Sequence, residues 1–207
     1  MDLDGIFHEI VAELDAFDEI RERIMVLGRK GIRSCSEAIK KLHRHEEGVD
    51  GLIEEARSTL KEMLGITKNH PAVHVESYFD GIYQEFVEAN VLKQVYAGTD
   101  LTPPSRLDPP VPAVQYLTGL CDAIGELRRA ILDCIRNEDF EGAQKYFSMM
   151  EKFHDLVNAL DYPNAVIPDV RHKSDGNRKL IQATRSELTM AMHIHKLNEN
   201  LTKSSKA

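Results

Sequence analysis

The stretch 111–136 has an apolar residue at every third or fourth position, which is the period of a helix with one buried face. The apolar residues of this stripe are Val114, Leu117, Cys121, Ile124, Leu127, Ile131 and Cys134. Two carboxylates, Asp122 and Glu126, lie beside the stripe, four residues and thus one turn apart. Like charges at this spacing repel each other unless a cation or a bound proton compensates. The pair is therefore either an ordinary surface pair of acids or part of a cation site.

The same helical period recurs along most of the chain. The predicted helices cover residues 3–47, 50–64, 72–96, 111–136, 139–160 and 170–201. Gly28 and Gly31 weaken the first helix and would allow a kink there. Segment 97–112 contains five prolines, so it must be a surface connection. Since no segment shows sustained strand alternation, we expect an all-α fold, with one domain over 1–207 and a frayed tail at 202–207.

Charge limits the partners of the chain. The formal net charge of −8 excludes a generic polyanion binder, so any nucleic-acid site must be a local basic patch. The first predicted helix is acid-rich over its first 19 residues and basic in its second half. The candidate nucleic-acid-binding residues of that half are Arg21, Arg23, Arg29, Lys30 and Arg33, with Arg171, Lys173 and Arg178 as the alternative location. No apolar run approaches the roughly 20 residues of a membrane span. The three cysteines form no CxxC motif and the N-terminus does not resemble a signal peptide, so we expect a cytoplasmic protein that is not bound to a membrane.

A second acid pair, Glu85 and Glu88, lies on one face of the predicted helix 72–96. If this helix and helix 111–136 pack as antiparallel neighbours, four carboxylates can converge, as they do in the metal sites of helical bundles. Oxygen ligands favour Mg²⁺ or Mn²⁺ over Zn²⁺, and such ions support in-line attack on a phosphodiester. The ExxH motifs of di-iron bundles are missing from both helices, which disfavours an oxygenase or a ferritin.

Three segments resemble the translin family, and most closely its catalytic branch, that of translin-associated factor X. They are YLTGLCDAIGELRRAIL at 116–132, EDFEGAQKYFSMME at 138–151 and LDYPNAVIPDVRHKSDGNRKLIQATRSELTMA at 160–191. The similarity covers roughly residues 5–200. The resemblance implies a bundle of about seven helices that assembles into a closed, barrel-like oligomer, with an octamer as the family's habit.

The resemblance also implies an activity. The family's catalytic acids lie in two segments, which here read QEFVEA, with Glu85 and Glu88, and DAIGE, with Asp122 and Glu126. All four acids would be both catalytic and metal-binding. The function implied is a Mg²⁺- or Mn²⁺-dependent endoribonuclease that cleaves single-stranded RNA inside a homo-oligomeric barrel. The alternative is a non-catalytic scaffold of the translin type that binds single-stranded RNA or DNA. In the absence of metal, replacing Asp122 with Asn should leave the protein at least as stable, because it removes one of two like charges.

Overall fold

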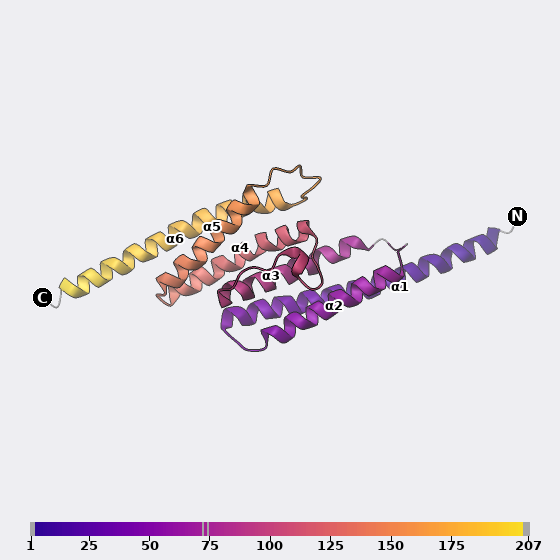
Figure 1. Cartoon of the computed structure of the whole chain (residues 1–207), viewed down its shortest axis with the longest axis horizontal. Helices are drawn as coiled ribbons and strands as arrows, with labels where there is room; N and C mark the ends of the chain where they lie inside the picture. Colours follow the sequence, from indigo (N-terminus) through magenta and orange to yellow (C-terminus); the bar gives the residue numbers. More distant parts are fainter. Residues whose placement is uncertain (1–2, 72, 74, 205–207) are drawn as a thin grey trace. The chain divides into compact units, whose positions relative to one another are not determined.

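The computed structural model describes residues 3–71, 73 and 75–204. In this part of the chain it contains six α-helices, two short 3₁₀ helices and no strand, which confirms the all-α prediction. The six α-helices of the described residues compare with the roughly seven that the resemblance implied. The elements are α1 (Leu3–Arg44), α2 (Val49–Asn69), η1 (Glu76–Phe79), α3 (Asp80–Ala97), η2 (Pro104–Arg106), α4 (Ala113–Arg136), α5 (Phe140–Asn158) and α6 (Val170–Ser204) (Figure 1). None of the helices in the described residues is both long and apolar enough to cross a membrane.

The chain forms two compact units, Met1–Gln115 and Tyr116–Ala207. The boundary between them falls in the first turn of α4. The single domain over 1–207 therefore stays a prediction, and each unit is described by itself below.

The first unit is built on the packing of α1 against α2 and α3. Its core contains the fully buried side chains of Ile24, Leu60, Met63, Ile82, Phe86 and Leu92. Helix α1 runs without interruption through Gly28 and Gly31, both of which are buried. A Cβ atom at Gly31 would overlap the side chain of Ile82 on α3 and would lie 3.4 Å from Cγ2 of Thr59 on α2. Gly31 therefore lets three helices approach closely, and α1 continues through both glycines as a single helix.

Two helix boundaries in the first unit differ from the predictions. Helix α2 follows Gly48, which has a φ of 90°, and it continues past Gly65 to Asn69. Gly65 is exposed and an added Cβ would meet nothing within 4 Å, so its only cost is the weak helix propensity of glycine. The buried face of α2 outweighs that cost. Helix α3 begins at Asp80 and is preceded by the 3₁₀ helix η1 over Glu76–Phe79, whereas the predicted start at residue 72 lies outside the described residues. The proline-rich segment 98–112 contains only η2, as its prolines require.

The second unit contains α5 and α6 packed together, with nearly all of α4. Its core includes Leu127 and Ile131 of α4, Met150 and Phe153 of α5, and Leu188 of α6. The side chain of Asp139 caps α5 by accepting a hydrogen bond of 2.9 Å from the Gly142 amide. Helix α6 is continuous to Ser204, so the tail is not frayed at 202–204, and 205–207 lie outside the described residues.

Candidate functional site

The acid pair on α3 lies on the side of the helix that meets α1. Glu88 is buried, with 8% of its surface exposed, and Glu85 is half-buried. Ser36 of α1 donates a hydrogen bond of 3.0 Å from Oγ to Oε2 of Glu85. Carboxylates are rarely buried without compensation, because desolvation disfavours the charged form. Glu88 is thus a buried carboxylate in a helix whose other buried residues are apolar, apart from Tyr83.

The two glutamates also influence a neighbouring thiol. Burial, followed by the negative charges of Glu85 and Glu88, raises the pKa of the Cys35 thiol well above its ordinary value. Cys35 is fully buried on α1, one residue before Ser36. Its thiol stays protonated at neutral pH and is therefore not a nucleophile. Both carboxylates are therefore close enough to Cys35 of α1 to affect its titration electrostatically.

The acid pair on α4 has a basic partner from α6. Nζ of Lys173 lies 2.5 Å from Oδ1 and 2.6 Å from Oδ2 of Asp122, and both side chains are partly buried. Glu126, one turn further, lies 3.8 Å from Arg129. One turn along α6, Asn177 donates a hydrogen bond of 3.0 Å to the carbonyl of Cys121 and holds α6 against α4. The cation that compensates Asp122 here is therefore an ammonium group.

The ion pair bears on one expectation from the sequence. Removing the charge of Asp122 would leave the partly buried ammonium of Lys173 without its carboxylate. Loss of one partner of such a pair is destabilising, so the ion pair favours a loss of stability on Asp122→Asn, whereas the sequence led us to expect a protein at least as stable. The sequence identified the two acids but not this pairing, because Lys173 is 51 residues away from Asp122.

The donor atoms of both acid pairs suit a hard divalent cation. Glu85 and Glu88 belong to the first unit, and Asp122 and Glu126 to the second. Among the residues that the structure describes, no three His, Cys, Asp or Glu side chains form a group that could hold a metal ion. Magnesium is commonly held by only one or two carboxylates together with water and substrate phosphates. Each pair of carboxylates offers only oxygen donors and is therefore compatible with Mg²⁺ or Mn²⁺.

The five candidate nucleic-acid-binding residues of α1 fall into two groups. Three of them are paired with acids: Arg21 with Asp18 and Glu22 at 2.7 and 2.8 Å, Arg23 with Glu62 at 2.9 Å, and Lys30 with Glu55 at 3.1 Å. The hydrogen bonds from Lys30 and Ser34 also lower the pKa of Glu55.

Arg29 and Arg33 form the second group. Both are exposed, and neither makes an ion pair or a side-chain hydrogen bond within the described part of the chain. They are the members of the basic set whose charges are not already compensated by an acid of the chain.

The two uncompensated arginines are close to the acid pair of α3 along α1. Arg29, Arg33 and Ser36 follow each other at intervals of four and three residues, so they share one face of the helix. Arg33 precedes Ser36 by one turn, or about 4.5 Å along the helix axis. Because Ser36 donates a hydrogen bond to Glu85, the face of α1 that carries Arg29 and Arg33 contacts the first acid pair one turn further along the helix.

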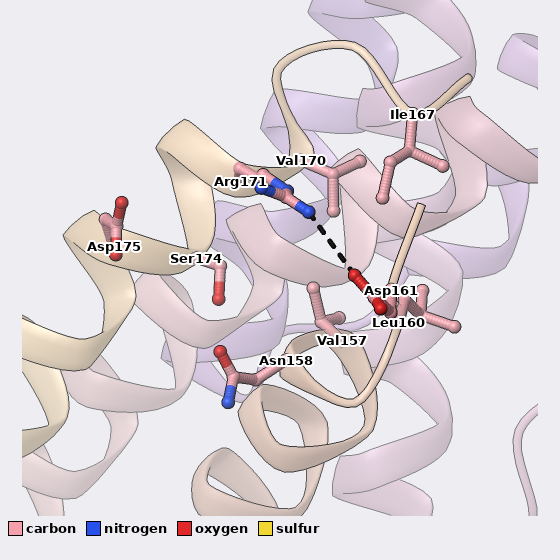
Figure 2. A pocket seen from close by; sticks show the side chains of 9 residues that line it. All are labelled: Val157, Asn158, Leu160, Asp161, Ile167, Val170, Arg171, Ser174 and Asp175. Atoms are coloured by element: carbon pink, nitrogen blue, oxygen red, sulfur yellow. Dashed lines mark ion pairs between the residues drawn. The ribbon is translucent and has the colours of Figure 1, made fainter. Parts of the chain in front are cut away.

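A pocket in the second unit is lined by one of the alternative basic residues, Arg171. It has a volume of about 380 Å³ and lies between the C-terminal end of α5 and the first turns of α6 (Figure 2). Figure 2 shows Arg171 facing Asp161, with a charged contact of 3.6 Å. Arg178 is paired with Asp175 at 2.7 Å, and Lys173 with Asp122. All three cations have an acidic partner, so this location is less suited to phosphates than the face of Arg29 and Arg33.

Comparisons with known proteins agree with the expected fold. No protein-family model matches the chain. Over 188 residues the chain is 30% identical to the uncharacterized protein MJ0175 of Methanocaldococcus jannaschii, a match that covers 89% of this chain and 82% of that protein.

Three similar solved structures carry the name C3PO. One is AfC3PO in a complex with duplex RNA, with a TM-score of 0.79, 23% identity, and coverage of 93% of this chain and 98% of that one. The crystal structure of AfC3PO has a TM-score of 0.66, 26% identity, and coverage of 91% and 97%. The crystal structure of apo-NeC3PO has a TM-score of 0.78, 20% identity, and coverage of 89% and 96%. These neighbours are C3PO assemblies of the translin family, and the all-helical fold is shared with them.

Proposed function

The chain belongs to the same family as the uncharacterized protein MJ0175 of Methanocaldococcus jannaschii, and we propose that it is a metal-dependent endoribonuclease of the translin type. Its substrate is single-stranded RNA, and it works as a homo-oligomeric barrel of about eight copies. Within the translin family it resembles the branch of translin-associated factor X, which carries the same four acids. The likeness to AfC3PO, one structure of which is a duplex RNA complex, supports RNA as the ligand.

The observation that carries this proposal is the hydrogen bond between Ser36 and Glu85. It connects the acid pair of α3 to the face of α1 on which Arg29 and Arg33 are exposed and uncompensated. A nuclease needs cations that bind the phosphates of the strand and acids that act on one of them. The first unit supplies both: the arginines lie on α1, the acids lie on α3, and Ser36 of α1 contacts Glu85.

Each group of residues has a separate task. Arg29 and Arg33 bind phosphates and orient the strand, and Ser36 fixes the carboxylate of Glu85. Each acid pair, Glu85 with Glu88 and Asp122 with Glu126, supplies carboxylates that would hold Mg²⁺ or Mn²⁺. A divalent cation supplies a more acidic bound water and positive charge that offsets the charge developing on the phosphodiester. In the absence of metal, Lys173 neutralises Asp122, so a metal ion competes with an ammonium group for this carboxylate.

A scaffold that binds RNA or DNA without cleaving it is the second candidate. The close pairing of Lys173 with both oxygens of Asp122 favours it, because this is the geometry of a structural salt bridge. Arg29 and Arg33 would keep their role in such a protein, whereas the four acids would have no catalytic task.

Cleavage assays with defined RNAs distinguish the two candidates. A labelled single-stranded RNA and a duplex of the same sequence are incubated with the protein in Mg²⁺, Mn²⁺ or EDTA. We expect cleavage of the single strand with either metal and none in EDTA. Glu88→Gln and Asp122→Asn should lose cleavage while retaining RNA binding. The matched control is Asp133→Asn, which alters an acid of α4 that is paired with Arg136 and should cleave at the parent rate.

Two results would overturn the nuclease. If the parent protein binds RNA but leaves it intact with every metal, it is a scaffold. If Glu88→Gln and Asp122→Asn cleave as fast as Asp133→Asn, the activity belongs to other residues.

A further inference from the structure

Two helix ends carry stripes of apolar side chains that face solvent. On α1 the stripe consists of Leu3, Phe7, Ile10 and Leu14, and on α6 of Met190, Ile194, Leu197 and Leu201. Each of these eight side chains is at least 46% exposed. Large apolar side chains gathered on one surface typically mark an interaction site. We call these two stripes the α1 seam and the α6 seam.

The two seams share one spacing. Successive residues are four, three and four positions apart in both, which is the heptad pattern of a coiled coil. Both seams span eleven residue steps, or about 16 Å of helix. Two helices with this pattern can interlock their side chains along the whole length of the seams.

Neither seam is covered by its own unit. All residues from 3 to 16 are exposed, and Figure 1 shows the N-terminal end of α1 extending past the end of α2. On α6, His195 lies opposite the first residue of α5, Phe140, with ring centroids 4.8 Å apart. The residues of α6 after His195 therefore continue beyond the end of α5.

Charge indicates which surfaces pair. Residues 3–19 include six acids and no lysine or arginine, so two α1 seams would repel each other. Residues 190–204 include Lys196 and Lys203 but only one acid, Glu199. The α6 seam also begins at a groove of about 440 Å³ whose lining includes Arg185, Met190 and Ile194. The residues around the α1 seam are acidic and those around the α6 seam carry a small positive charge, so the two seams, which have equal length, are complementary in charge.

We propose that the α1 seam of one copy packs against the α6 seam of a second copy as a two-helix coiled coil. The contact joins two different surfaces, so it generates a ring when the rotation between copies closes. The inference specifies a junction of the homo-oligomer that is part of the proposed function. It is tested by mass and not by RNA cleavage, so either proposal can fail without the other.

The test uses two variants that each break one seam. Phe7→Asp with Ile10→Asp places two charges in the α1 seam, and Ile194→Asp with Leu197→Asp does the same in the α6 seam. Analytical ultracentrifugation should show that each variant alone has a lower mass than the parent. When they are mixed in equal amounts, the intact α1 seam of the second variant can bind the intact α6 seam of the first. A heavier complex containing both variants in a 1:1 ratio should therefore appear.

The control is Leu156→Asp, which alters an equally exposed side chain of α5, 66% exposed, outside both seams and should keep the parent mass. Circular dichroism checks folding: each seam variant should retain the helical content of the parent except for the seam segments themselves, because the seams pack against nothing in their own units. If only the α1 variant is smaller, the α1 seam pairs with itself and the proposal is wrong. Parent mass for both variants, or no complex on mixing, also overturns it.

Discussion

The Asp122 carboxylate and the Lys173 ammonium make a partly buried ion pair with both carboxylate oxygens engaged. We predict that Asp122→Asn lowers the free energy of unfolding of the metal-free protein by about 1 kcal/mol, as expected for a partly exposed pair. Urea denaturation in EDTA measures this change. A double-mutant cycle with Lys173→Gln should give a coupling energy of similar size. Asp133→Asn, whose partner Arg136 is mostly exposed, should change stability little, and an equal loss in that variant would contradict the prediction.

Cys121 makes the free energy of unfolding depend on pH in the alkaline range. Burial and the nearby charge of Asp122 raise the pKa of the Cys121 thiol from 9.0 to about 11, although Lys173 acts in the opposite direction. Between these values the unfolded thiol loses its proton while the folded thiol retains it, so stability falls as pH rises from 9 to 11. Below pH 9 the thiol is protonated in both states and contributes no pH dependence.

Replacing Cys121 isolates this contribution. We predict that Cys121→Ala loses less stability than the parent between pH 9 and 11, with a difference on the order of 2 kcal/mol. Urea denaturation at a series of pH values measures both curves. The packing cost of the smaller side chain is the same at each pH, so it shifts the curve without changing its slope. Parallel curves would show that Cys121 does not titrate in this way.

The α4 acids illustrate what a sequence can and cannot reveal about a single residue. The helical period placed Asp122 and Glu126 on one face, and the structure has them there. Period within one helix carries no information about which distant residue lies opposite. Lys173 and Ser36 were therefore not identified as partners of the acids, although both reach them directly.

The five candidate phosphate-binding residues of helix α1 do not contribute equally to its surface charge. Because Arg21, Arg23 and Lys30 are paired with acids, we predict that Arg29 and Arg33 provide most of the phosphate contacts. Each contact with single-stranded nucleic acid contributes about −0.7 to the log–log salt dependence of binding. Arg29→Ala with Arg33→Ala should therefore reduce the slope by about 1.4 in fluorescence-anisotropy titrations.

The matched control removes two charges from paired positions of the same helix. Arg23→Ala with Lys30→Ala should alter the slope by less than half as much, because these side chains already contact Glu62 and Glu55. Equal slopes for the two double variants would contradict the division into paired and uncompensated residues. If the salt dependence of binding is reduced only when Arg171 and Arg178 are replaced, the RNA binds to the second unit instead.

Gly31 determines how closely α1, α2 and α3 pack. We predict that Gly31→Ala is destabilising by about 1 kcal/mol, because overlap with Ile82 outweighs the gain in helix propensity. Thermal or urea unfolding measures this. Gly65→Ala, at a helical glycine of α2 with open space around it, should stabilise the protein by about 0.5–1 kcal/mol. Shortening the opposing side chain with Ile82→Val should relieve part of the cost of Gly31→Ala. Without such relief, the cost does not come from this contact.

The glycines also show why element boundaries were harder to predict than elements. The apolar period identified the helices correctly, because burial of one face repeats along each of them. Gly28, Gly31 and Gly65 look alike in the sequence, since each only weakens a helix. The neighbours of each position decide its effect, and they belong to other helices: Gly31 meets Ile82, whereas Gly65 meets nothing.

The chain as a whole has a unit boundary that cuts through a helix. Helix α4 starts at Ala113, and the second unit starts at Tyr116. A helix gains its stability cooperatively, so loss of its first turn is coupled to the rest of it. We therefore predict one unfolding transition, with equal calorimetric and van't Hoff enthalpies at a fixed protein concentration. Two separate transitions would contradict the single domain expected from the sequence.

The exposed α1 seam has a consequence for how the two ends of the chain become ordered. An isolated helix of a dozen residues is only marginally stable in water, because most helical stability in proteins comes from tertiary packing. Residues 3–14 have no such packing in a single copy. With the seams paired, amide protons of these residues should exchange slowly at high protein concentration and quickly on dilution, whereas those of the α1 residues packed on α3 should not respond. The helical order of residues 3–14 would then depend on the concentration of the protein, because the segment becomes ordered only when two copies associate. A cell that makes more of the protein would therefore increase the fraction of copies in which this segment is folded.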